Sequence, residues 1–235
     1  MEKLRTRLIL NYLKKVKSCT LEDLQRKFAV SSATIHRDVQ ELSRRDAVSV
    51  VRGGLVWNEV AEAPRSTSPY TERVVANRLA KIAAAKKALK SILEGDIIFL
   101  DSSTTVYELA TLLKDADFAH LTIVTNSLAI MQNFRKMPRE WALIGLGGNF
   151  DAQLNSTLGS ATLEQLKTVN ITKAYLSAFG VDEKNVTTNH ERQAALIRTI
   201  IDMAGKSYLI ADPSKLGRTG LYRIAPRGAF TEIFS

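Results

Sequence analysis

Five short apolar runs recur through residues 97–212, and their spacing constrains the fold more than any other feature of the sequence. Each run has the length of a strand and is apolar nearly throughout, which is the pattern of strands buried on both faces. Amphipathic stretches lie between the runs. This alternation predicts a parallel sheet covered by helices on both sides. The predicted strands are IIFLD (97–101), LTIVT (121–125), WALIG (141–145), KAYLSA (173–178) and SYLIAD (207–212), and the predicted helices are Thr105–Leu113, Ser160–Val169 and Arg192–Ala204.

A stretch with proline, serine and threonine at residues 58–70 predicts a domain boundary before these runs. Pro64 and Pro69 lie in it, two of only 5 prolines in the chain, and this composition is typical of a linker. The 235 residues are enough for two domains. We therefore expect an α/β protein with a winged helix-turn-helix domain at 1–58, a linker at 59–71 and a larger Rossmann-like parallel-sheet domain at 72–235. A long helix is expected over Thr71–Leu93.

The first 58 residues show the pattern of three short helices followed by a hairpin. Apolar residues at helical spacing, among them Ile9 and Leu13, predict the first helix. Thr20 is expected to cap a second helix, Leu21–Phe28, with Asp23 completing a capping box. The run VSVVRGGLVW after the third helix predicts the hairpin, with Arg52 at its tip.

The third helix has an apolar face and an opposite face of small, polar and basic residues. Ser31 is expected to cap it, and the inward face consists of Ile35, Val39 and Leu42. The residues that then project outward are Ser32, Ala33, His36, Arg37 and Gln40. Small side chains allow close approach to the major groove, and the donors can reach base edges or phosphates. Asp38 is expected to form a structural salt bridge with one of Arg37, Arg44 and Arg45.

The charge distribution agrees with a polyanionic partner for this part of the chain. The net charge is +9, and residues 1–60 hold 12 Lys/Arg against 7 Asp/Glu, a net +5 in the first quarter of the sequence. A small helical domain for oligomerisation or protein binding, with a solvated basic face, would show the same excess. Charge alone therefore leaves both interpretations open.

Residue types and spacing in this segment resemble the helix-turn-helix signature of the DeoR-family bacterial transcriptional regulators. The resemblance rests on Arg5, Ile9 and Leu13 and, after a gap of seventeen residues, on Ser31, Thr34, Ile35, His36, Arg37, Asp38 and Val39. It implies binding to double-stranded operator DNA, with Ser31–Gln40 as recognition helix. The residues expected to contact DNA are Ser31, Ser32, Thr34, His36, Arg37, Gln40, Arg44 and Arg52.

The resemblance extends over nearly all the remaining chain. DeoR-family regulators join such a head to a sugar-phosphate-sensing domain similar in fold to ribose-5-phosphate isomerase. The matching segments are LDSSTT (100–105), VTNS (124–127), GLGGNF (145–150), SAFGVD (177–182) and ADPSKLG (211–217). Each falls at the carboxyl end of a predicted strand, or just beyond it, where an open α/β sheet binds ligands.

The chemistry of these segments agrees with an anionic ligand. Four hydroxyl residues, 102–105, follow a strand and open a helix, so that backbone N–H groups and hydroxyls converge as in a phosphate cradle. Lys215 could contact a phosphate or sugar oxygen, or could be a surface lysine. The residues expected to bind a phosphorylated sugar or polyol effector are Asp101, Ser102, Ser103, Thr104, Thr105, Thr125, Asn126, Gly147, Gly148, Asp182 and Lys215.

Two other functions remain open at this stage. A sugar-phosphate isomerase or deaminase with a DNA-binding head would need a carboxylate base, and Asp182 and Glu183 lie roughly where the isomerases carry an acidic loop. The paired acids of those enzymes are missing from the preceding SAFG, and His120 and His190 are expected at the surface, so sensing without catalysis is favoured. The other alternative is a DNA-binding protein indifferent to sequence.

Further features of the sequence predict the compartment, the ligands and the assembly of the protein. One cysteine, Cys19, cannot form an intrachain disulfide, and no secretion signal or long apolar segment is visible, so a cytoplasmic protein without membrane contact is expected. No metal site, cofactor or catalytic residue is predicted. The resemblance implies a homodimer or homotetramer. The chain ends in a predicted strand, AFTEIFS, earlier than is usual in the family, which leaves open whether a tail is missing.

Overall fold

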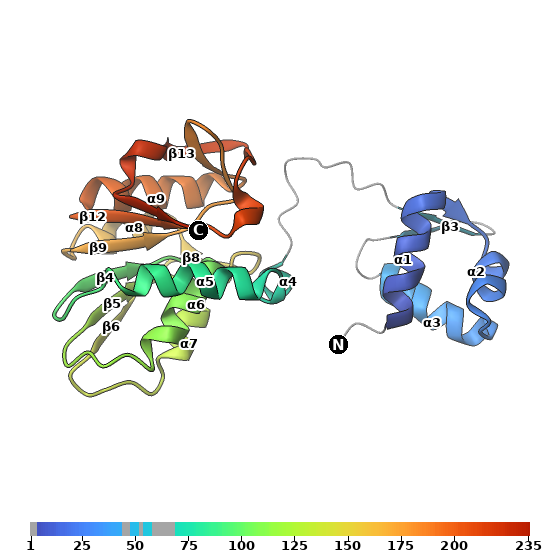
Figure 1. The fold of residues 1–235 in the computed structure, drawn as a ribbon, viewed down its shortest axis with the longest axis horizontal. Coiled ribbons are helices and arrows are strands. Elements are labelled where there is room, and N and C mark those ends of the chain that lie inside the picture. The colour runs from blue at the N-terminus through green and yellow to red at the C-terminus, as the bar shows by residue number, and fades with distance from the viewer. Residues whose placement is uncertain (1–3, 44–47, 52–53, 58–68) are drawn as a thin grey trace. The chain divides into compact units, whose positions relative to one another are not determined.

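A computed structural model describes residues 4–43, 48–51, 54–57 and 69–235. The chain divides into two compact units, Met1–Ala63 and Pro64–Ser235, which we call the N-terminal and C-terminal units (Figure 1). Most of the predicted linker, along with Arg44 and Arg52, lies outside the described residues. Residues 70 and 71 at its predicted end are the first residues of a helix in the C-terminal unit.

The N-terminal unit has a helix-turn-helix core and a three-stranded antiparallel sheet in the order β1-β3-β2. Thr20 caps the second helix of this unit, and the side chains of Thr20 and Asp23 form the predicted capping box. The second helix ends at Ala29, whose backbone is left-handed (φ 49°), and a short turn leads from there to the third helix. The elements are α1 (Leu4–Val16), β1 (Ser18–Cys19), α2 (Leu21–Phe28), α3 (Ser32–Ser43), β2 (Val48–Val51) and β3 (Gly54–Trp57).

One apolar cluster holds these elements together. The inward faces predicted for the helices are confirmed at Leu24, Ile35, Val39 and Leu42, which are all buried. The predicted hairpin is present, but Gly54 is the first residue of β3 rather than part of the tip. A Cβ there would lie 2.7 Å from the carbonyl oxygen of Cys19, so the pairing of β1 with β3 requires glycine at this position.

The C-terminal unit contains the predicted parallel sheet. Six strands lie in the order β14-β12-β9-β4-β5-β6, and all the pairs within it are parallel. The five predicted strands are confirmed to within one or two residues. The strand at 142–145 lies at one edge of the sheet and is largely exposed, so the expectation that every run is buried on both faces was wrong for this strand. The last strand, β14 (Glu232–Phe234), forms the other edge. The others are β4 (Ile97–Leu100), β5 (Thr122–Thr125), β6 (Ala142–Gly145), β9 (Lys173–Leu176) and β12 (Lys206–Ile210).

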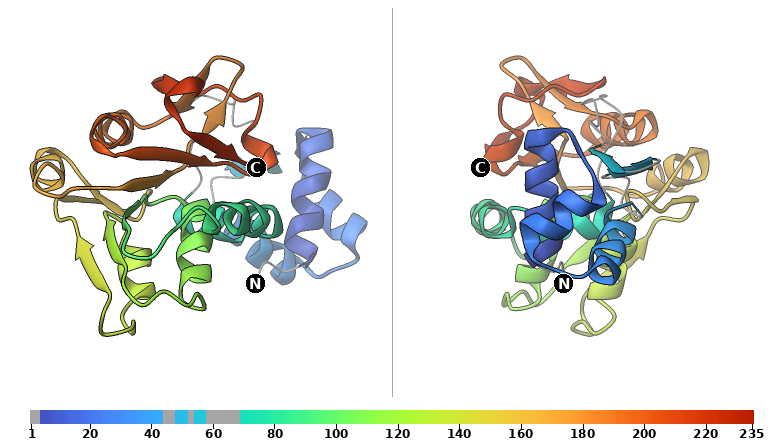
Figure 2. Two further views of the ribbon diagram at one scale, coloured as in Figure 1. Left: turned by 60° about the vertical axis from the view of Figure 1, so that its left-hand side comes forward. Right: turned by 90° about the vertical axis from the view of Figure 1, so that its right-hand side faces the viewer.

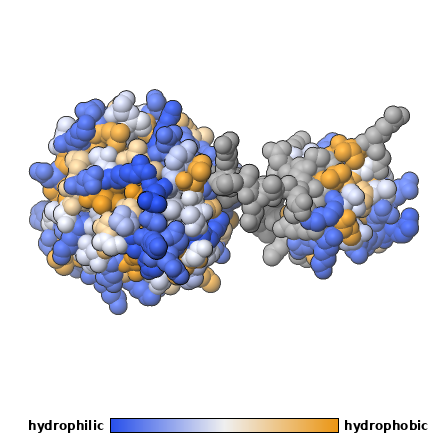
Figure 3. Space-filling view, turned by 90° about the horizontal axis from the view of Figure 1, so that it is seen from above, coloured by the Kyte–Doolittle hydropathy of each residue, from blue (hydrophilic) through white to orange (hydrophobic). Residues whose placement is uncertain are grey.

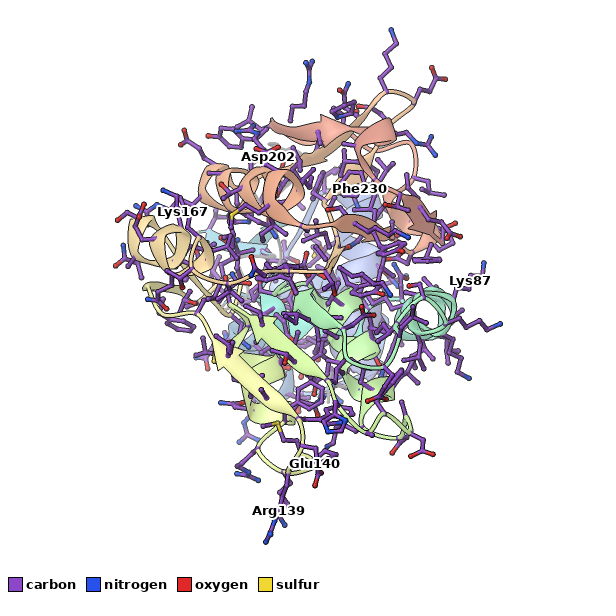
Figure 4. All side chains as sticks on the ribbon, turned by 90° about the vertical axis from the view of Figure 1, so that its left-hand side faces the viewer. Lys87, Arg139, Glu140, Lys167, Asp202 and Phe230 are labelled. Atoms are coloured by element: carbon purple, nitrogen blue, oxygen red, sulfur yellow. The ribbon has the colours of Figure 1, made fainter. Side chains whose placement is uncertain are left out.

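Helices cover both faces of this sheet, as predicted. One apolar cluster includes buried residues of α5, α6 and α7, and a second includes those of α8 and α9. The left view of Figure 2 shows the two groups on opposite sides of the strands, and in Figure 4 Lys87 on α5 and Asp202 on α9 point away from opposite faces. The helices are α5 (Arg78–Leu89), α6 (Thr104–Leu113), α7 (Leu128–Asn133), α8 (Ser160–Leu166) and α9 (Glu191–Met203).

Two small antiparallel sheets, which the sequence reasoning did not include, lie beside the main sheet. A hairpin, β7 (Asn149–Asp151) with β8 (Ser156–Leu158), follows β6. The second sheet has the order β10-β11-β13 and is formed by β10 (Gly180–Val181), β11 (Asn185–Thr188) and β13 (Tyr222–Pro226). Between β12 and β13 lies the short 3-10 helix η1 (Pro213–Lys215), and η2 (Arg227–Ala229) precedes β14.

The helix predicted over Thr71–Leu93 is two helices. The first, α4 (Tyr70–Val75), ends before Asn77, whose backbone is left-handed (φ 53°, ψ 29°), and α5 begins at Arg78. Asparagine tolerates this conformation better than most residues. Helical periodicity does not register a change of backbone at a single residue, so it did not reveal the break.

In the space-filling view of Figure 3, hydrophobic residues on the visible face of the C-terminal unit form small patches among hydrophilic ones. Within the part of the chain that the structure describes, no helix combines the length and apolar character needed to cross a membrane.

Candidate functional site

The outer face of α3 carries the side chains expected there. Ser32, His36, Arg37 and Gln40 are exposed, and Thr34 is partly buried. The Ser31 hydroxyl lies 3.0 Å from that of Thr34, at the start of the helix. These outward residues cover one continuous surface of α3, because the buried face is occupied by Ile35, Val39 and Leu42.

Asp38 forms a salt bridge, but not with the partners expected. Its carboxylate is buried, with 1% of the side chain exposed, and accepts hydrogen bonds from Arg5 of α1 at 2.5 Å (Nε to Oδ2) and 3.2 Å (Nη2 to Oδ1). Sequence reasoning considered only neighbours along α3, whereas the packing of α1 on α3 brings in a residue 33 positions away. The pair fixes α3 against α1 and leaves Arg37 unrestrained by Asp38.

Replacing Asp38 with alanine is expected to lower the melting temperature of the N-terminal unit by several degrees, because the guanidinium of Arg5 loses its partner and the buried contact between α1 and α3 is broken. Scanning calorimetry of the full chain measures this. Glu22→Ala, which removes an exposed carboxylate from the first turn of α2, is the matched control and should lower the transition much less, because it breaks no buried contact. Equal melting temperatures for the two variants would show that the ion pair does not hold α3.

A cavity of about 240 Å³ opens at the carboxyl end of the parallel sheet. The residues that follow three neighbouring strands, β4, β9 and β12, contribute to its wall, among them Ser103, Thr104 and Ser177. Its remaining wall comes from α4, α5, the start of α9, the turn between β7 and β8, and β11 with the segments beside the β10-β11-β13 sheet. The basic residues among the lining side chains are Arg73, Lys81, His190, Lys215 and Arg218, and the acidic residue among them is Asp212.

Two lysines of this wall are removed from water without an ion pair among the described residues. Lys81 is only 4% exposed. Lys215 is partly buried, and its ammonium donates to the hydroxyls of Ser177 at 2.6 Å and Thr105 at 3.3 Å. Burial lowers the pKa of Lys215 to about 8 and also lowers that of Lys81. The nearby carboxylate of Asp212 raises both pKa values and offsets part of the cost of burying these cations, and an anion in the cavity would offset more of it.

Asp101 braces the cavity wall. Its buried carboxylate accepts a hydrogen bond from the backbone N–H of Ser103 at 2.8 Å and from that of Ser177 at 2.7 Å. Burial raises the pKa of Asp101. The Ser103 side chain in turn caps α6 by accepting from the N–H of Val106. These bonds tie the ends of β4 and β9 together and aim the start of α6 at the cavity.

The structure therefore brings together six of the predicted effector residues. Ser103, Thr104 and Lys215 line the cavity. Asp101 and Thr105 contact lining groups directly, and the buried Ser102 lies between Asp101 and Ser103 in the chain.

The other five predicted residues lie away from the cavity and make structural contacts. The Thr125 hydroxyl donates to the carbonyl of Leu100, and the Asn126 amide donates to that of Thr157. Asp182 accepts two backbone N–H groups in the turn between β10 and β11. The glycines pack against α8: the N–H of Gly147 donates to Gln165, and a Cβ on Gly148 would lie 2.1 Å from the Thr162 hydroxyl.

Several lining residues were missed. Arg73 and Lys81 belong to α4 and α5, and no motif marks them, because their role depends on how those helices pack against the sheet. Arg218 follows the ADPSKLG segment directly, and its guanidinium lies 4.3 Å from the ring centroid of Phe179. His190 was expected at the surface, but it is half-buried in the cavity wall, and burial lowers its pKa. His120 is exposed, as expected.

Comparison with known proteins agrees with both units. Residues 5–61 match the DeoR-like helix-turn-helix domain, and residues 76–235 match the DeoR C terminal sensor domain. The HTH-type transcriptional repressor GlcR of Bacillus subtilis is 30% identical over 92% of this chain and 81% of its own length. The HTH-type transcriptional regulator IolR of the same organism is 31% identical over 88% and 80%. The L-fucose operon activator of Haemophilus influenzae is 27% identical over 98% and 90%.

The solved structures that resemble this chain share less sequence identity with it than these relatives do. A D-ribose-5-phosphate isomerase in complex with phospho-erythronic acid is 21% identical, with a TM-score of 0.43, and the match covers 59% of this chain and 54% of the isomerase chain. The curated relatives are named as regulators rather than enzymes, and both domain types match over their lengths. The chain is a DNA-binding transcriptional regulator of the DeoR family.

Proposed function

We propose that this regulator is a repressor of a carbohydrate-utilisation operon and that a phosphorylated sugar or polyol controls it through the cavity at the carboxyl end of the sheet. It binds operator DNA through the outer face of α3 as a homodimer or homotetramer in the cytoplasm. The name of one relative, an L-fucose operon activator, supports the link to carbohydrate use, and that of GlcR supports repression.

The observation that carries the proposal is the pair of lysines, Lys81 and Lys215, in a small cavity beside the start of α6. Each lacks an ion-pair partner among the described residues, and an arriving phosphate would supply one. Backbone N–H groups at the start of α6 add a favourable potential for an anion. The volume of about 240 Å³ is near the lower end for ligand sites and suits a small ligand.

The test is a calorimetric titration of the full chain with D-ribose 5-phosphate, D-glucose 6-phosphate, D-fructose 1-phosphate and glycerol 3-phosphate, followed by a mobility shift on the upstream region of its own gene. At least one compound should bind and alter a specific shift. The unphosphorylated sugars are the controls. If none of the four binds, or if the sugars bind as tightly as their phosphates, the phosphate-sensing part of the proposal is wrong.

The affinity for the sugar phosphate should depend on pH through Lys215. This lysine has a pKa of about 8 in the empty cavity, so it is mostly charged at pH 7 and mostly neutral at pH 9. Because an anion binds the charged form, the dissociation constant should rise about tenfold from pH 7 to pH 9. Calorimetry at both values measures it. Lys215→Arg keeps the charge throughout this range, and its profile should be much flatter; an equally steep profile would assign the titration to another group.

A further inference from the structure

The cavity is built from two different parts of the chain. Lys215 belongs to η1, which follows β12, the second strand from one edge of the sheet. Arg73 and Lys81 belong to α4 and α5, the first elements of the C-terminal unit. In the sequence, α4 begins only about a dozen residues after β3, the last strand of the DNA-binding unit. A ligand that binds all three cations would therefore touch the part of the C-terminal unit nearest in sequence to the DNA-binding unit.

Contacts of the two basic residues hold the end of α4. The ammonium of Lys81 donates to the backbone carbonyl of Arg73, in the last turn of α4. The guanidinium of Arg73 donates to the carbonyl of Gln153, in the turn between β7 and β8, at 3.0 Å. Since an ammonium has three N–H groups, Lys81 can hold this carbonyl and an anion at the same time. An anion on Lys81 and Arg73 would thus act directly on the position of α4.

The break between α4 and α5 is tied to the same 3-10 helix that carries Lys215. The side-chain amide of Asn77 donates to the Ser214 hydroxyl at 3.0 Å, and this hydroxyl donates to Asp212 at 2.5 Å. Asn77 is also the residue between α4 and α5 whose backbone is left-handed. A change of the backbone at this one residue would redirect α4 without unfolding α5, which is the behaviour of a hinge residue.

On its other side, α4 borders open space. Tyr70, Thr71 and Val74 line a groove of about 580 Å³ between α4 and the helices α6 and α7. The hydroxyl of Tyr70 is buried and has no hydrogen-bond partner among the described residues. The residue is only 9% exposed, so the packing of α4 in this arrangement leaves one polar group unsatisfied. The groove gives α4 room for a second position.

The charges around the cavity link its contents to α4. The carboxylates of Asp212 and Asp101 raise the pKa of Lys215, whereas the cations of Lys81 and Arg73 lower it, so the carboxylates offset the repulsion among the three cations. An anion between the three cations would add a direct attraction that draws Arg73 and Lys81 toward Lys215. The two states of the cavity therefore differ in the force they exert on α4, as an allosteric element requires.

We propose that the ligand controls operator affinity by clamping α4. An anion in the cavity joins Lys81 and Arg73 to Lys215. The hydrogen bond between Asn77 and Ser214 then couples the bound anion to the hinge residue, Asn77. The inference rests on the proposed function, since it needs a phosphorylated ligand in this cavity. Asn77 and Ser214 are positioning residues here, and their loss should uncouple the two binding events.

The experiment measures two quantities on the full chain. Calorimetry gives the dissociation constant of each of the four sugar phosphates named above. Fluorescence anisotropy gives the dissociation constant of the operator without ligand and with the ligand at saturation. The ratio of these two operator constants is the coupling factor, and it does not depend on how tightly a variant binds the ligand. For the unmodified chain we expect a factor of about 5 to 150.

Asn77→Gly keeps a backbone that accepts positive φ and removes the amide, so the coupling factor should fall below about twofold while ligand binding is still measurable. Ser214→Ala removes the same hydrogen bond from its other side, so it should lower the coupling factor equally. The double variant should lower the coupling factor no further than either single variant. Asn170→Gly, an exposed position before β9, is the matched control and should keep the full factor.

The outcomes separate the two proposals. Full coupling in Asn77→Gly and Ser214→Ala would overturn the role of α4 and leave the phosphate site standing. Absence of any sugar-phosphate binding to the unmodified chain would instead overturn the site and, with it, the clamp. If Asn77→Gly shows an altered circular dichroism spectrum, Ser214→Ala alone decides, since it changes only one oxygen atom.

Discussion

Replacing Arg37 with alanine is expected to weaken binding to the operator about 5- to 150-fold for each half-site. The guanidinium is exposed on the outer face of α3, and an arginine that contacts a guanine contributes about 1–3 kcal/mol of discrimination. The melting temperature should not change, because Arg37 lies outside the apolar cluster and the ion pair of α3 belongs to Asp38 and Arg5. Fluorescence anisotropy at fixed salt, on operator and random DNA, measures the effect.

Arg26→Ala is the matched control for this prediction. Arg26 is also exposed and basic, but it lies on α2, so its loss removes the same charge without altering α3. Equal losses on operator and random DNA would show that Arg37 contacts phosphate rather than bases. A large fall in the melting temperature would show that its side chain supports the fold of the N-terminal unit.

Replacing Thr104 and Lys215 together with alanine is expected to lower sugar-phosphate affinity about 100-fold or more and to abolish its effect on operator binding. Lys215 provides a charge-assisted hydrogen bond to the anion, and Thr104 lies at the start of α6 where the phosphate is expected. Operator binding without ligand should be unchanged, since neither residue belongs to the N-terminal unit. Calorimetry and anisotropy on the full chain give the two readouts.

The control is Lys206→Ala. Lys206 is an exposed lysine at the first residue of β12, whereas Lys215 follows the carboxyl end of the same strand. Its loss changes the net charge equally and should leave ligand affinity within about twofold. Unchanged affinity in the double variant would contradict the placement of the phosphate beside Lys215.

Local patterns in the sequence were sufficient for the main elements. Near-continuous apolar runs indicated the strands, although β6 at the edge of the sheet is largely exposed. The capping box at Thr20 and Asp23 marked the start of α2 correctly. The face of α3 followed from the spacing of Ile35, Val39 and Leu42. These features depend on residues within one or two helical turns of each other, so they can be read without knowledge of the fold.

The sequence by itself also determined one half of the candidate site, because carboxyl ends of parallel strands must meet at one edge of the sheet. That rule places Ser103, Thr104 and Lys215 together, but it also pointed to Thr125 and Asn126, which lie away from the cavity at the end of β5. Only the tertiary structure decided the other half. Arg73 and Lys81 reach the cavity because of the left-handed turn at Asn77 and the packing of α5 on the sheet, and Asp38 pairs with Arg5 because α1 lies across α3. Such contacts join residues far apart in the chain, and no short-range pattern records them.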